Sequence, residues 1–152
     1  MLSAVFDISE KQLEQAGESD PEILSPFTFV QEKNGKLQAI PYRERYAKYL
    51  RPIAEKIEKA ANICTNRYFK LYLKARAKSL LDGSYREADI EWLNVKNSQI
   101  DFSIGPFERY LDKILFIKRI FQAHVGIINK NLTIQAEKIK ETLYSSAKLS
   151  YE

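Results

Sequence analysis

Residues 100–106 read Ile-Asp-Phe-Ser-Ile-Gly-Pro, and this stretch decides the fold class. Its apolar residues alternate with small or polar ones, which is the pattern of a half-buried β-strand. Gly105 and Pro106 then favour an edge strand or a bulge. Because the residues before this stretch repeat their apolar side chains at helical spacing instead, we expect the chain to combine helices and strands.

The segment that follows, from Ile114 to Ile128, fits either a helix or a strand. Its β-branched and aromatic residues, with Gly126 in the interior, favour a strand after about Lys118. This strand would close an antiparallel hairpin over about residues 98–128. From Asn129 or Asn131 onward, a C-terminal helix is expected whose apolar stripe consists of Leu132, Ala136, Ile139 and Leu143.

At the N-terminal end, two strand-like segments, 27–31 and 36–40, flank an Asn34-Gly35 pair. This pair tolerates positive φ at both central turn positions, so it predicts a β-hairpin. Ahead of it, the Ser9 and Gln12 spacing predicts a capped helix over 9–16 that Gly17 ends. Asp20-Pro21 predicts one further helical turn, which Ser25-Pro26 ends.

Between the two hairpins, Pro41 opens a long helical region, and Pro52 predicts a kink or break near residue 50. Thr65 is expected to cap a second helix that ends at Gly83, and Ser84 a third that ends at Trp92 or Leu93. A core-facing stripe is predicted from the 4-and-3 spacing of Tyr42, Tyr46 and Tyr49. The sequence therefore predicts one domain over residues 1–152 with a mainly helical α+β fold: N-terminal β-hairpin, helical middle, second antiparallel β-hairpin and C-terminal helix.

The counts of cysteine and histidine exclude several kinds of site. The chain has one cysteine, Cys64, and one histidine, His124. A disulfide within the chain and a zinc site built from Cys and His ligands are both excluded. The single thiol suits a reducing compartment, no signal peptide is visible, and no apolar run reaches membrane-spanning length, so we expect a cytoplasmic protein that does not contact membranes.

Single residues that could carry chemistry have simpler structural interpretations. His124 lies between apolar neighbours, and we interpret it as a core or partly exposed structural histidine. Cys64 is interpreted as a buried, inert thiol. The acidic residues Asp82, Glu87, Asp89 and Glu91 could bind a hard cation, but helix capping and a solvated face explain them as well.

Basic side chains concentrate between residues 36 and 80, interleaved with tyrosines. Nucleic-acid binding uses such combinations. Since the tyrosines follow a core-facing spacing, we interpret the cations as the solvated face of the helices, or as a surface for an acidic protein partner. Nucleic-acid binding is therefore not expected.

Two runs resemble the dipeptidyl-peptidase III family of zinc exopeptidases. The first is Tyr85-Arg86-Glu87-Ala88-Asp89-Ile90-Glu91-Trp92, and the second is Ile104-Gly105-Pro106-Phe107-Glu108-Arg109-Tyr110-Leu111-Asp112. Residues 40–46, 49–52 and 121–125 also resemble these proteins. The resemblance covers roughly residues 20–145, and its Gly-Pro-x-Glu-x-Tyr-x-Asp run is the distinctive part.

The resemblance implies a two-lobed peptidase several times longer than this chain. In that family a helical lobe carries zinc on a His-Glu-x-x-Gly-His helix, and peptide lies in the cleft between the lobes. This chain holds no such helix and would correspond to the part before it, with no cofactor of its own. The strand from Gly105 to Asp112 would lie nearest to substrate, which gives Gly105, Glu108, Tyr110 and Asp112 as substrate-cleft candidates.

Two functional hypotheses follow. The chain is a non-catalytic segment, scaffold and cleft wall, of such a dipeptide-releasing peptidase, or it is a stand-alone interaction or assembly module. The expected partner is accordingly the remainder of the peptidase or a second copy. An unpaired edge of the 100–128 hairpin invites strand addition by another chain. Alternatively, the strands 27–31 and 36–40 complete the same sheet.

Overall fold

The computed structural model describes residues 8–108 and 115–149, and its fold is the predicted mainly helical α+β fold with two antiparallel hairpins. The elements in chain order are α1 (Glu10–Ser19), the 3-10 helix η1 (Pro21–Leu24), β1 (Thr28–Lys33), β2 (Lys36–Pro41), α2 (Tyr42–Arg45), α3 (Ala47–Ile63), α4 (Arg67–Asp82), α5 (Arg86–Leu93), β3 (Ile100–Glu108), β4 (Ile120–Ile127) and α6 (Lys130–Leu149).

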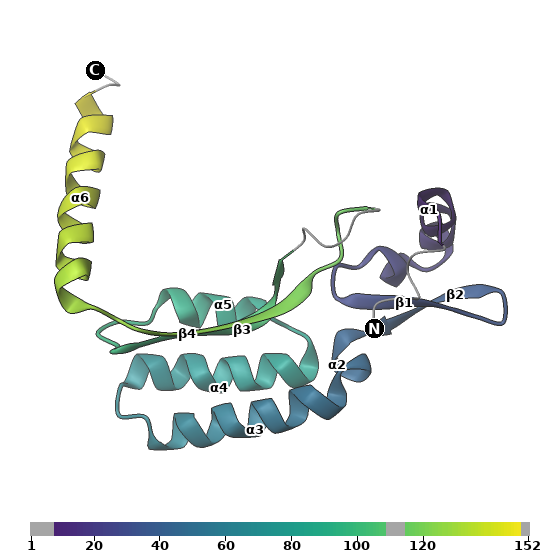
Figure 1. The fold of residues 1–152 in the computed structure, drawn as a ribbon, viewed down its shortest axis with the longest axis horizontal. Coiled ribbons are helices and arrows are strands. Elements are labelled where there is room, and N and C mark those ends of the chain that lie inside the picture. Colours follow the sequence, from purple (N-terminus) through teal and green to yellow (C-terminus); the bar gives the residue numbers. More distant parts are fainter. Residues whose placement is uncertain (1–7, 109–114, 150–152) are drawn as a thin grey trace.

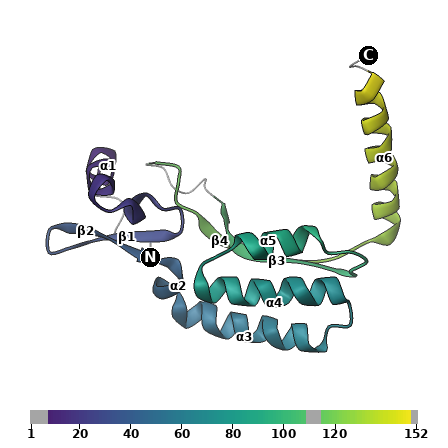
Figure 2. The ribbon, with the colours of Figure 1, turned by 180° about the vertical axis from the view of Figure 1, so that it is seen from behind.

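The two hairpins lie in different parts of the molecule (Figure 1). The β1–β2 hairpin sits with α1 and η1 at one end, while the β3–β4 hairpin lies along the helices α3, α4 and α5. The reverse view agrees, and in both views α6 points away from the far end of the second hairpin (Figure 2). Each sheet has two strands, so the alternative in which all four strands complete one sheet is wrong.

The N-terminal hairpin and helix form through the predicted local signals. Asn34 and Gly35 have φ of 54° and 73°, and β1 and β2 pair in register around them. Ser9 caps α1 in a capping box, but the helix continues past Gly17 to Ser19. An added Cβ at Gly17 would lie 2.5 Å from Leu24 Cδ1. This glycine therefore permits close packing of η1 against α1 instead of ending the helix.

The helix boundaries in the middle differ from three predictions. The break falls at Tyr46, between α2 and α3, and Pro52 lies inside α3. The cap of α4 is Asn66, whose side chain accepts from two backbone N–H groups, in place of the expected Thr65. No side chain caps α5, which begins at Arg86. Residues that can cap a helix are common in loops, so the local sequence placed the starts of α4 and α5 within a residue or two and the break before α3 less closely.

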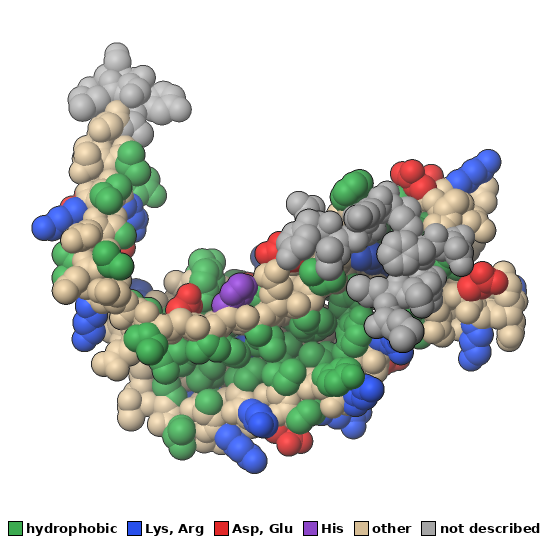
Figure 3. All heavy atoms as spheres, in the orientation of Figure 1, with side chains coloured by type: hydrophobic (Ala, Val, Ile, Leu, Met, Phe, Trp, Pro, Cys, Tyr) green, Lys and Arg blue, Asp and Glu red, His purple; other side chains and the backbone are tan. Residues whose placement is uncertain are grey.

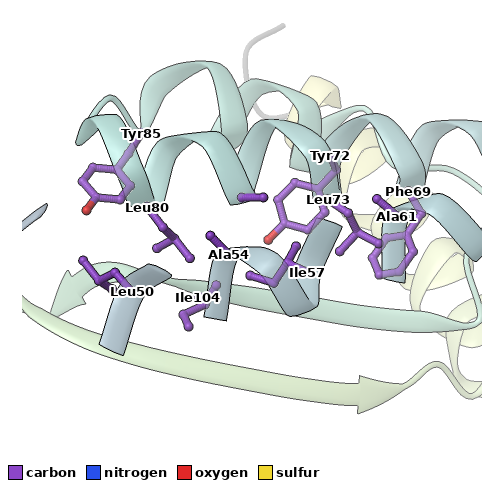
Figure 4. Packing of buried hydrophobic residues seen from close by; sticks show 11 residues of the cluster. Leu50, Ala54, Ile57, Ala61, Phe69, Tyr72, Leu73, Leu80, Tyr85 and Ile104 are labelled. Atoms are coloured by element: carbon purple, nitrogen blue, oxygen red, sulfur yellow. The ribbon is translucent and has the colours of Figure 1, made fainter. Parts of the chain in front are cut away.

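The main hydrophobic core lies between α3, α4 and the β3–β4 hairpin (Figure 4). Each fully buried large apolar side chain here stabilises the fold by about 1.5–3 kcal/mol. Tyr49 is 57% exposed, so its predicted place in the core stripe is wrong, and Leu50 takes that place. The labelled members come from both helices, the loop after α4 and the strand: Leu50, Ala54, Ile57, Ala61, Phe69, Tyr72, Leu73, Leu80, Tyr85 and Ile104.

The second hairpin confirms the strand prediction after Lys118. Ile104 of β3 is buried against the helices, and the Tyr72 hydroxyl donates to the Phe102 carbonyl at 2.8 Å. At its open end, where β4 leads to α6, the hairpin emerges from the core, and Val125 and Ile127 are 76% and 90% exposed. Figure 3 shows apolar side chains gathered between this hairpin and α3 on the face in view.

Lys118 ties the second hairpin to the N-terminal part of the molecule. Its ammonium donates to the carbonyls of Ile23 and Ser25, each at 2.6 Å, and to the Thr28 hydroxyl at 2.8 Å. Next to it, the Arg119 N–H donates to the Pro26 carbonyl at 3.0 Å. These bonds fix where β4 begins relative to β1 and η1.

Candidate functional site: the β3 bulge

The four substrate-cleft candidates fall partly within the described residues. Gly105 and Glu108 lie in the last four residues of β3, whereas Tyr110 and Asp112 fall in residues 109–114, outside the part of the chain that the structure describes. Gly105 is buried and Glu108 is half-buried. The Glu108 carboxylate is therefore the described candidate that a ligand could reach.

The strand carries a bulge at this point, as Gly105-Pro106 predicted. Pro106 pairs with Phe121 and Glu108 with Ile120, so Phe107 is the extra residue. Bulges bend a strand and re-aim its side chains, and they are common beside active sites. The bulge thus sets the direction of Glu108 relative to the rest of β3.

Gly105 makes room for the bulged residue. An added Cβ at this position would lie 2.7 Å from Phe107 Cζ and 2.9 Å from Cε1. Real Cβ atoms do not approach so closely, so the ring folds over a position that only glycine leaves open. The role of Gly105 is consequently steric, and it acts through Phe107.

Two arginines contact Phe107 from different elements. Arg76 of α4 places its guanidinium carbon 5.5 Å from the ring centroid, a cation–π distance. Arg119, just before β4, donates from Nη1 to the Phe107 carbonyl at 2.9 Å. The hydroxyl of buried Tyr42 donates to the Arg119 carbonyl at 2.7 Å and holds this second arginine in place.

Arg76 is the residue beside the bulge that the sequence pattern did not single out. It was assigned to the solvated face with the other cations, yet it is 1% exposed. Its Nη2 contacts Asp89 Oδ1 at 2.5 Å, and its Nε and Nη1 are buried with no hydrogen-bond partner among the described residues. The spacing offered a signal, because Arg76 lies three and four residues after the core residues Leu73 and Tyr72.

Two buried phenols near Arg76 are held in their protonated form. Burial raises the pKa of Tyr85 to about 12, although the nearby Arg76 cation opposes the rise. Burial likewise raises the pKa of Tyr72, again against Arg76. The protonated Tyr72 hydroxyl is the group that donates to β3.

The other residues singled out from the sequence do not assemble into a site. His124 is exposed, with Nε2 3.2 Å from Gln122 Oε1, and Cys64 is half-buried, so the prediction of a buried thiol is wrong. Asp89 pairs with Arg76, and Glu87 with Lys78. The described residues contain no cluster of three His, Cys, Asp or Glu side chains that could hold a metal ion. They therefore do not fit a zinc centre.

Comparison with known proteins places this arrangement in a family. Residues 10–148 match the sequence model of peptidase family M49. The chain belongs to this family. The match includes both hairpins and α6, so these elements belong to the M49 segment.

Two solved M49-type structures share the fold. Dipeptidyl-peptidase III from Caldithrix abyssi superimposes with a TM-score of 0.82 at 33% identity, over 88% of this chain and 26% of that protein. The enzyme from Corallococcus sp. strain EGB gives 0.79 at 25% identity, over 90% and 26%. The resemblance to a dipeptidyl-peptidase III segment is thereby confirmed.

A curated plant protein is also similar. Nudix hydrolase 3 from Arabidopsis thaliana is 28% identical over 138 residues, which are 91% of this chain and 18% of that protein. The chain thus spans about a quarter or less of the relatives that it matches. Among its described helices, none is both long enough and apolar enough to span a membrane.

Proposed function

We propose that this chain acts as the non-catalytic scaffold and substrate-cleft wall of an M49 dipeptidyl peptidase that releases dipeptides from peptide N-termini with zinc bound elsewhere in the protein. The observation that carries the proposal is the bulged β3 strand, held in a fold that matches two dipeptidyl-peptidase III structures and presenting the half-buried Glu108. The expected compartment is the cytoplasm.

Glu108 suits the recognition of a peptide N-terminus. An enzyme that removes dipeptides must locate a free α-ammonium group, and a carboxylate is its natural partner. Glu108 lies where β3 leaves the core, with the buried Gly105 and Pro106 before it. We assign it the substrate ammonium, with Tyr110 and Asp112 as further candidates by family resemblance.

The remainder of an M49 polypeptide would cover the surfaces that this chain leaves exposed. Every described side chain of α6, residues 130–146, is exposed, and so are the last five residues of β4. Leu132, Ile139 and Leu143 on α6 are 61–65% exposed. Apolar surface of this extent typically marks an interaction site.

A chimera tests the proposal. Residues 10–148 replace the matching segment of the Caldithrix abyssi enzyme, and dipeptide release is measured with chelator and after zinc is restored. We expect activity that depends on zinc, a KM raised about tenfold or more by Glu108→Gln, and no change from Glu55→Gln on the exposed face of α3. A folded, zinc-loaded chimera without activity would refute the proposal.

The chain by itself is expected to release no dipeptides. Its described residues do not fit a zinc centre, and the sequence holds one histidine. A chromogenic dipeptidyl substrate checks this, with His124→Ala beside it to identify contaminating activity. Release that chelator abolishes, zinc restores and His124→Ala removes would contradict the expectation.

The second candidate is a self-associating interaction module. The sequence of β4, Ile-Phe-Gln-Ala-His-Val-Gly-Ile, contains no Lys, Arg, Asp, Glu or Pro. Natural edge strands usually carry such residues to prevent pairing with another chain. Sedimentation distinguishes this candidate, because a 17.7 kDa species that persists across a tenfold dilution at micromolar concentration would exclude it.

A further inference from the structure

We propose that Arg76 is a positioning residue for Glu108: its buried guanidinium holds the Phe107 bulge and so sets the direction in which the Glu108 carboxylate leaves β3. This inference rests on the proposed function, in which Glu108 binds the substrate ammonium. The positioning itself is a property of the free chain and can be measured without substrate.

The hydrogen bonds of the hairpin do not by themselves fix the bulge in one conformation, so contacts from other elements are needed. An extra residue interrupts the ladder of hydrogen bonds, and Pro106 has no N–H to contribute. The pairing with β4 resumes at Glu108 and Ile120 after a register shift. The ladder therefore leaves the conformation at Phe107 open, and the side chains around it decide that conformation.

Three contacts fix the bulge from three directions. The ring of Phe107 covers Gly105, and the Arg76 guanidinium lies against that ring. Just before β4, Arg119 donates to the Phe107 carbonyl. Of these partners Arg76 comes from α4, so it couples the bulge to the rigid helical core.

The burial of Arg76 indicates that its contact with the Phe107 ring does more than stabilise the fold. Taking a guanidinium out of water is costly, and an apolar side chain of similar volume commonly serves a buried position equally well. Only Nη2 of Arg76 has a charged partner, Asp89, while Nε and Nη1 have no hydrogen-bond partner among the described residues. The faces of Tyr72 and Phe107, each 5.5 Å away, provide the remaining favourable contacts.

The structure also supplies a variant that should fold. Arg76→Met keeps the volume and removes the buried charge, and the partner left behind is not buried, because the Asp89 side chain is 53% exposed. Arg76→Lys retains a cation without the planar fork. Lys78→Met is the matched control, since Lys78 lies on the same helix in an exposed pair with Glu87.

The experiment compares these chains by NMR. Amide hydrogen exchange and chemical shifts at Gly105, Phe107 and Glu108 report the bulge. Titration with a short peptide, once with a free N-terminus and once N-acetylated, reports the ammonium preference. We expect Arg76→Met to accelerate exchange at these amides about tenfold and to reduce the preference for the free N-terminus about fivefold, with the melting temperature maintained.

The controls separate the positioning role of Arg76 from the binding role of Glu108. Lys78→Met should match the wild type, and Arg76→Lys should fall between wild type and Arg76→Met. Unchanged exchange and shifts at Phe107 and Glu108 in Arg76→Met would overturn the positioning role, whatever the peptide result. A wild-type chain that shows the ordered bulge but no preference for the free N-terminus would instead count against the proposed role of Glu108.

Discussion

The helices α4 and α6 share an amphipathic sequence pattern, but only one of them is packed. Helix α4, of 16 residues, buries Phe69, Tyr72, Leu73, Arg76, Ala77, Ser79 and Leu80. Helix α6 has 20 residues with an apolar stripe, and all of its described side chains are exposed. An apolar stripe therefore predicts that a helix has a buried face in its functional state, and it does not tell which element buries that face.

The largest expected effect comes from truncating matched leucines on the two helices. Leu80 is fully buried, so Leu80→Ala should lower the free energy of unfolding by about 2–5 kcal/mol through lost burial and a cavity. Leu143 is 65% exposed, and Leu143→Ala should change stability by less than about 0.5 kcal/mol. Urea unfolding measures both. Similar losses would mean that α6 is packed in solution.

Two lysine substitutions near the open end of the second hairpin, one on β3 and one on β4, extend the comparison. Phe102 packs against the core and Ile127 is 90% exposed. Phe102→Lys should lower stability by about 2–4 kcal/mol because it places a cation against the core. Ile127→Lys should leave the fold intact and abolish any self-association through β4, which sedimentation would detect. Unfolding by Ile127→Lys would show that the open end of the hairpin is covered within the monomer.

Two glycines on opposite strands should give a smaller difference in stability when each is replaced by alanine. An added Cβ at Gly105 meets Phe107, whereas nothing lies within 4 Å of one at Gly126. Gly105→Ala should destabilise by roughly 1–3 kcal/mol, and Gly126→Ala by less than about 0.5 kcal/mol. The double variant Gly105→Ala, Phe107→Leu should recover part of the loss, since a smaller side chain frees the space. Absence of any recovery would place the clash elsewhere.

Alkaline pH should reveal the smallest effect. The pKa of Tyr85 is raised to about 12, so the unfolded chain loses this proton first and stability falls as pH rises from about 10 to 12. The buried Tyr85 hydroxyl has no partner among the described residues, so Tyr85→Phe should be nearly neutral at pH 7 and should lessen the alkaline loss. Thermal unfolding across pH 8–11 checks this. An undiminished alkaline loss in Tyr85→Phe would contradict it.

Much of the fold followed from local chemistry. The Asn34-Gly35 turn, the Ser9 capping box and the alternation in β3 each act over a few neighbouring residues, and the turn, the cap and the strand all formed where they were predicted. Helix ends were predicted less well. Pro52 is accommodated inside α3, and the break moved to Tyr46, because packing decides between several local stop signals of similar strength.

The candidate site was predicted in part. Family resemblance pointed to Glu108, and the Gly105-Pro106 pair predicted an edge strand or a bulge. No sequence pattern indicated that Gly105 leaves space for the Phe107 ring. Arg76 was grouped with surface cations because charge normally faces water. Its burial became apparent only when α4, α5 and β3 were seen together, since its partners lie 13 and 31 residues away in the chain.

The sequence by itself determined the mixed helix and strand composition, both hairpins and the exclusion of a Cys and His zinc site, because turn preferences, alternation and residue counts are local or additive properties. The tertiary structure alone decided that the hairpins form two separate sheets, that Tyr49 faces solvent, and that Arg76 is buried beneath the bulge. These outcomes depend on which apolar faces meet across long stretches of chain. Apolar attraction has no direction, so the pattern of one segment does not specify the segment that buries it.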